Sequence, residues 1–77
     1  MIYQYYIFIV KKDVNGEYSH EVKWAYDEDE IKAYDKGENI YYDELSKAAI
    51  NDTVFTSVTL ISANGEMKKC NCKYHVS

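Results

Sequence analysis

The side chains best suited to bind a metal ion lie at residues 70–75, in the run Cys-Asn-Cys-Lys-Tyr-His. Thiolates and imidazole are zinc ligands, so Cys70, Cys72 and His75 would supply most of a four-ligand structural site. On a β-strand, however, alternate side chains point to opposite faces, which separates His75 from the two cysteines. The pattern therefore predicts cysteines packed in the core as small hydrophobic groups. A Cys/His metal-binding mini-domain is the alternative, and no cofactor is expected.

Acidic residues at 27–30 raise the question of a calcium loop. Such a loop takes oxygen ligands at its positions 1, 3 and 5 and glycine at position 6. Asp27 and Asp29 fit the first two of these positions, but Ile31 and Lys32 occupy the next two. The spacing excludes this type of calcium site.

No group of residues has the pattern of a catalytic site. His20 lies beside Val22 and Trp24 on the apolar side of an alternating strand, so it is interpreted as a packed structural histidine. The sequence has no glycine-rich phosphate loop, no serine elbow and no His-x-x-x-His pair. We therefore expect that the protein is not an enzyme.

Length and composition indicate one small globular domain spanning residues 1–77. The chain is 47% hydrophobic and 29% charged, which is typical of a folded protein. Residues 1–10 are apolar, but they lack the features of a signal peptide and are too short to span a bilayer. Two cysteines separated by one residue do not make a disulfide framework. We expect a cytoplasmic protein with no membrane contact.

Two β-hairpins are predicted, one on each side of an acidic segment. Residues 2–11 are apolar on both faces, as in a central strand covered on two sides, whereas residues 18–26 alternate as in a half-buried strand. A turn at residues 14–17 joins them. Residues 53–62 and 66–76 form the second hairpin.

The loop of the second hairpin sets which residues of its strands lie opposite each other. A three-residue loop, Ala63-Asn64-Gly65, with Gly65 in the left-handed position, gathers the apolar side chains on one face. It predicts three pairs: Val58 with Cys70, Thr56 with Cys72, and Val54 with Tyr74.

Two helices are predicted between the hairpins. For the first, Asp27 and Glu30 match an N-cap and its N3 partner, and Gly37 matches the residue that follows a helix end. At their spacing, Ile31 and Tyr34 would face the sheet.

The second helix is predicted from about Tyr42 to Asn51, with Leu45, Ala48 and Ala49 facing inward. The predicted fold is therefore α+β. It is a small antiparallel sheet of two hairpins in the order β-β-α-α-β-β, with one or two short helices on one face.

Charge is concentrated between the hairpins. All nine basic residues are lysine, and the absence of arginine argues against sequence-specific nucleic-acid binding. Residues 27–52 hold nine acids and three lysines, a net charge of −6. Such a local field steers a basic partner, although a charge run is also the ordinary appearance of a solvated face.

Aromatic residues offer a second binding chemistry. Tyr3, Tyr5, Tyr6 and Trp24 could stack single-stranded bases or a small ligand on a sheet face. Only a few lysines accompany them, so this interpretation is the alternative rather than the main hypothesis.

The main hypothesis is a small acidic protein-binding module. In its most concrete form it is an inhibitor of the kind that phages and mobile elements encode. It would act as a nucleic-acid mimic that blocks a basic nucleic-acid-binding or defence protein. Eight residues would contact the partner: Glu28, Asp29, Asp35, Glu38, Asp43, Glu44, Tyr41 and Tyr42. The sequence names neither the partner nor the oligomeric state, and a homo-oligomer stays open.

Overall fold

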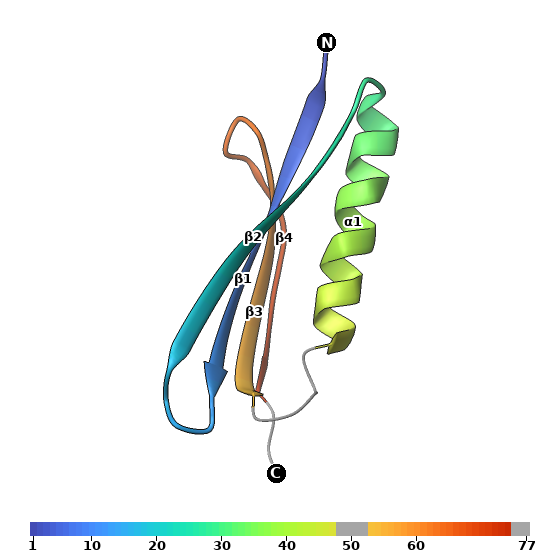
Figure 1. Cartoon of the computed structure of the whole chain (residues 1–77). Helices are drawn as coiled ribbons and strands as arrows, with labels where there is room; N and C mark the ends of the chain where they lie inside the picture. Colours follow the sequence, from blue (N-terminus) through green and yellow to red (C-terminus); the bar gives the residue numbers. More distant parts are fainter. Residues whose placement is uncertain (48–52, 75–77) are drawn as a thin grey trace.

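The computed structural model describes residues 1–47 and 53–74. Four strands, β1 (Tyr3–Asp13), β2 (Tyr18–Asp27), β3 (Thr53–Ser62) and β4 (Met67–Tyr74), form one antiparallel sheet. A single helix, α1 (Glu30–Ser46), lies along one face of that sheet (Figure 1). The α+β class and the two hairpins are confirmed. The order is β-β-α-β-β, however, with one helix among the described residues instead of two.

The sheet order is β2-β1-β3-β4, so β1 and β3 are central and β2 and β4 are the edges. In the first hairpin Tyr6 lies opposite Trp24 and Phe8 opposite Val22. The Asp13 side chain holds the turn by accepting hydrogen bonds from two backbone N–H groups within it, each at 2.9 Å. The hairpin agrees with the prediction from residues 2–26.

The second hairpin has the expected loop but not the expected register. Gly65 has φ of +90°, and Ser62 N donates to the Glu66 carbonyl at 2.9 Å, as a three-residue loop requires. Between the pairs Ile61–Met67 and Leu60–Lys69, however, β4 contains one extra residue, Lys68. This bulge moves every later residue of β4 to the other face.

The predicted pairs in that hairpin are therefore wrong. Val58 lies opposite Asn71, Thr56 lies opposite Lys73, and Cys70 and Cys72 lie opposite Thr59 and Ser57. Cys70, Cys72 and Tyr74 alternate with Asn71 and Lys73 in the same way whether or not an extra residue precedes them. The alternation of β4 therefore does not distinguish the bulge from a regular strand.

Helix α1 begins later in the chain than predicted. Its N-cap is Asp29, whose side chain accepts hydrogen bonds from Ile31 N at 2.9 Å and Lys32 N at 3.2 Å. Asp27 instead accepts from Asp29 N at 2.9 Å, just before the helix. Both residues use the capping chemistry of Asp, but the chain enters the helix at the second of them.

Gly37 does not end a helix, because α1 continues through it to Ser46. A Cβ atom at this position would lie 3.1 Å from Leu60 Cδ1 and 3.4 Å from Tyr5 Cβ. The absent side chain lets the helix backbone approach β1 and β3 closely. Glycine is thus explained by packing, which outweighs its low helix propensity.

The core lies between α1 and the sheet. From the helix, Ala33, Gly37, Tyr41 and Leu45 repeat every four residues, the spacing of one helix face. They pack on buried side chains of the two central strands: Tyr5, Ile7, Ile9, Val58 and Leu60.

This inner face differs from the prediction at one position and agrees at two. Ile31 is 73% exposed, because it lies two residues before Ala33 and therefore on the opposite side of the helix. Tyr34 contacts the Tyr5 ring edge-to-face with centroids 5.5 Å apart, and Leu45 is buried. Ala48, Ala49 and Asn51 lie outside the described residues.

No helix within residues 1–47 and 53–74 has the length and apolar character needed to cross a bilayer.

We expect Gly37→Val to lower the free energy of unfolding by about 2 kcal/mol, because its side chain must displace Leu60 and Tyr5. Asn39→Val is the matched control, since Asn39 is exposed on the same helix and Asn and Val have similar helix propensity. Urea denaturation of both variants measures the difference. Equal stabilities would show that the close helix–sheet contact is unimportant.

Candidate functional site

Two of the eight residues predicted to contact a partner lie inside the molecule. Tyr41 is 4% exposed and Glu44 is 3% exposed, both on the inner face of α1. The Glu44 carboxylate forms an ion pair with Lys23 of β2. The hydrogen bond from Lys23 to Glu44 raises the pKa of the lysine, which favours its charged form. The expectation that Tyr41 and Glu44 face solvent is wrong, because the helix runs straight through Gly37 and turns them inward.

Most of the other six residues have partners within the chain. Asp29 caps α1, and Asp43 pairs with Lys47 at 2.8 Å. The hydrogen bond from Lys47 lowers the pKa of Asp43. The predicted acidic surface is thus partly neutralised by Lys47, the C-cap residue of α1.

Lys69 of β4 neutralises the middle of the helix in the same way. Its Nζ donates to the Tyr42 hydroxyl at 3.0 Å, lies 5.4 Å from the centre of the Tyr42 ring, and lies 3.4 Å from a Glu38 carboxylate oxygen. These contacts raise the pKa of Lys69 above its usual range, with the Tyr42 hydrogen bond as the largest cause. Among the eight residues, Glu28 and Asp35 are exposed and have no ion pair within the described part of the chain.

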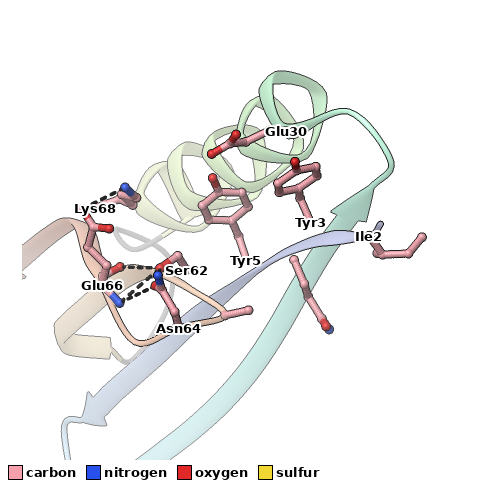
Figure 2. Close-up of a pocket in the computed structure, with 10 residues that line it drawn as sticks. Ile2, Tyr3, Tyr5, Glu30, Ser62, Asn64, Glu66 and Lys68 are labelled. Carbon is pink, nitrogen blue, oxygen red and sulfur yellow. Dashed lines mark hydrogen bonds and ion pairs between the residues drawn. The ribbon is translucent and has the colours of Figure 1, made fainter.

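A small cavity of about 260 Å³ lies where the start of α1 meets the loop of the second hairpin. Figure 2 shows the rings of Tyr3 and Tyr5 directed toward Glu30, with Lys68 on the other side. Lys68 pairs with Glu66 at 3.1 Å, and burial raises the pKa of Tyr5, with the Glu30 carboxylate adding to the effect. The cavity can hold a small polar molecule, but its lysine already has an acidic partner.

The largest uncovered surface is the side of the sheet away from α1, which we call the open face. In Figure 1 the helix lies on one side of the four strands, and none of the described residues covers the other side. Strand register places eighteen side chains on the open face: Gln4, Tyr6, Phe8, Val10 and Lys12; Tyr18, His20, Val22, Trp24 and Tyr26; Phe55, Ser57, Thr59 and Ile61; and Met67, Cys70, Cys72 and Tyr74.

Apolar and aromatic groups dominate this surface. Trp24 is 57% exposed, and Phe8 and Val22 are each 40% exposed. Phe55 and Tyr74 lie in contact at one end with ring centroids 4.9 Å apart. Such side chains, left in water, are the normal mark of an interaction surface rather than of a solvated sheet face.

Charge is almost absent from the open face. Among its described residues Lys12 alone belongs to the Asp, Glu, Lys and Arg types, and Lys12 Nζ lies 5.5 Å from the centre of the Tyr18 ring. In the middle of the face, Thr59 Oγ1 and Cys70 Sγ are within hydrogen-bonding distance at 3.4 Å. The open face can therefore bind an apolar surface but offers little attraction to phosphate.

Three predictions about buried residues are corrected by this arrangement. The apolar side of residues 18–26 is exposed instead of half-buried, His20 is exposed instead of packed, and Cys70 and Cys72 are exposed instead of in the core. The first two predictions placed the apolar side of residues 18–26 next to the helix, and the third failed because the bulge at Lys68 moves the two cysteines to the other face. The sheet has two apolar sides, and α1 covers the one formed by Tyr5, Ile7 and Ile9.

Within residues 1–47 and 53–74, no three His, Cys, Asp or Glu side chains are close enough to hold a metal ion. Cys70 and Cys72 share the open face, but His20 lies on the opposite edge strand of the sheet, and His75 is outside the described residues.

Comparison of the chain with protein-family models, curated proteins and solved structures found no match.

The Lys23–Glu44 pair gives a test of this geometry. Lys23→Met leaves a buried carboxylate without its cation, so we expect the free energy of unfolding to fall by about 2–4 kcal/mol. Adding Glu44→Gln removes the buried charge and should restore more than half of that loss. Thermal or urea denaturation of the wild type, the two single variants and the double variant measures the coupling. If the changes in the free energy of unfolding caused by Lys23→Met and Glu44→Gln simply add in the double variant, the Lys23–Glu44 ion pair is contradicted.

Proposed function

We propose that this protein is a protein-binding module that associates through the open face of its sheet. The observation that carries the proposal is the composition of β1. Its inward residues Tyr5, Ile7 and Ile9 are buried, and its outward residues Tyr6, Phe8 and Val10 are equally apolar. An antiparallel sheet with one solvated face normally alternates apolar and polar residues. A central strand that is apolar on both sides is suited to burial on both sides.

The chemistry of the open face favours a protein partner. Trp and Tyr are enriched where proteins bind each other, since they bury much apolar area and still satisfy a polar group. A partner for this face needs an apolar surface, and it does not need a charged surface of opposite sign. Stacking of single-stranded bases on the sheet is the alternative. Of the residues that the sequence suggested for it, Tyr6 and Trp24 lie on the open face, whereas Tyr5 is buried and Tyr3 packs against the core. One lysine gives little neutralisation of phosphates.

A second candidate surface is the outer side of α1, where Glu28 and Asp35 are exposed without an ion pair in the described residues. This observation supports the acidic version of the hypothesis, in which the helix blocks a basic nucleic-acid-binding or defence protein, as inhibitors from phages and mobile elements do. The surface is smaller than the sequence predicts, because most neighbouring carboxylates are paired or buried.

We expect Trp24→Lys to reduce capture of the partner at least tenfold, because it places a charge within an apolar interface. Ile31→Lys is the matched control. It makes the same change at an apolar residue that is also exposed but lies on the helix, outside the open face. The measurement is a quantitative pull-down from lysate of the native host, with circular dichroism to verify folding. Equal capture by the two variants would contradict the proposal.

The acidic surface makes a different prediction. If it binds the partner, Asp35→Lys should weaken capture several-fold at low salt and have little effect at high salt, since exposed charges are screened. Glu17→Lys, which reverses an exposed acid far from the helix, is the control. Binding through the open face should be almost insensitive to salt, so the same pull-down at two ionic strengths distinguishes the two surfaces.

A further inference from the structure

We infer that the occupant of the open face is a second copy of this chain, with the two sheets packed face to face around a two-fold axis parallel to the strands. This inference rests on the proposed function, since both require the open face to bind protein. It adds the identity of the partner and the direction of packing.

Charge is the first argument for a second copy. Two identical surfaces repel each other when they carry a large net charge, yet the open face carries only Lys12 among its described residues. Lys12 lies in an end row of the sheet, beside Tyr18, where its ammonium group can remain in solvent. An apolar, nearly uncharged face needs an apolar, nearly uncharged partner surface. The open face of a second copy is such a surface.

Shape is the second argument. In the two middle rows of the open face, the strands β2 and β1 carry the larger side chains and β3 and β4 carry small ones. The rows are Val22-Phe8-Thr59-Cys70 and His20-Val10-Ser57-Cys72. The middle of the face is therefore raised on the β2/β1 half and lower on the β3/β4 half, whereas the outer rows carry large side chains on both halves.

A two-fold axis parallel to the strands places the raised half of each copy over the lower half of the other. Phe8 then lies against Thr59 of the second copy, and Val22 lies against its Cys70. An axis perpendicular to the strands would place β2 over β2 and large side chains over large ones. Interdigitation of large and small groups is how two packed layers reach protein-like density, which selects the parallel axis.

Area is the third argument. Four strands about 4.8 Å apart and ten residues long at about 3.3 Å per residue present roughly 600 Å². Two copies would bury roughly 1,200 Å², at the lower end of stable protein–protein interfaces. The surface is large enough for a dimer that dissociates on dilution.

Sedimentation velocity over a range of concentrations is the first test. We expect a monomer–dimer equilibrium in which Trp24→Lys raises the dissociation constant at least tenfold and Ile31→Lys leaves it unchanged. A monomer at every concentration would overturn the inference. So would a dimer that Trp24→Lys does not weaken, because that dimer uses another surface.

Cross-linking tests the direction of packing. Within one chain, positions 22 and 70 lie on opposite edge strands, three strand spacings or about 14 Å apart. In the proposed dimer, each lies opposite the other position in the second copy. We expect a short bismaleimide to join Val22→Cys/Cys72→Ser into covalent dimers, with the new thiol at position 22 of one copy linked to Cys70 of the other.

Two control variants carry one of these thiols each: Cys72→Ser keeps Cys70, and Val22→Cys/Cys70→Ser/Cys72→Ser keeps only the new thiol. Neither should cross-link efficiently. Efficient linking of the variant with the thiol at position 22 alone would place β2 over β2 and overturn the proposed axis.

The outcomes separate this inference from the proposed function. A monomeric chain whose capture of a lysate protein is still lost in Trp24→Lys overturns the second copy as the occupant and leaves the proposed function standing. A chain in which neither self-association nor capture responds to Trp24→Lys overturns both.

Discussion

The close approach of α1 to the sheet at Gly37 is the contact on which the rest of the structure depends. With no Cβ in the way, the helix backbone lies directly over Leu60 and Tyr5. This allows one continuous helix to run along β1 and β3 and to bury Ala33, Tyr41 and Leu45 in a single row. The position of that row decides which side chains of the acidic segment face inward. The opposite side of the sheet is left uncovered by residues 1–47 and 53–74.

Several features of the fold could be predicted from the sequence because local signals and tertiary packing agree on them. The hairpin at residues 3–27 combines a strand that is apolar on both faces, a turn held by Asp13 and a strand that alternates. The loop at Gly65 uses the backbone freedom of glycine, as expected. Gly37, in contrast, is a glycine inside a helix, where the missing side chain lets α1 pack closely on the sheet. The sequence alone does not distinguish a helix stop from a helix–sheet contact, because the neighbour that decides it is Leu60, far along the chain.

The site was harder to predict for the same physical reason. Glu44 belongs to an acidic run, but its inward position depends on which face of α1 packs on the sheet. Its buried carboxylate is stabilised by Lys23 of β2, which is distant in the sequence. The bulge at Lys68 places Cys70 and Cys72 on the open face, and no residue pattern in β4 predicts that bulge. One signal was available: residues 2–11 are apolar on both sides. That pattern predicted a strand covered twice, and α1 supplies one of the two covers.

Stability and association are linked in a chain of this size. A domain of 77 residues buries a modest share of its surface, and its single core leaves little margin above unfolding. The side chains of the open face are only partly buried in the single chain, yet they occupy the positions on β1 where polar groups would improve solubility. Any protein that covers this face binds the folded state alone, and it stabilises that state by an amount that grows with the logarithm of its concentration above the dissociation constant. Under the proposed function, the apolar outer side of β1 is one layer of a core that a partner completes.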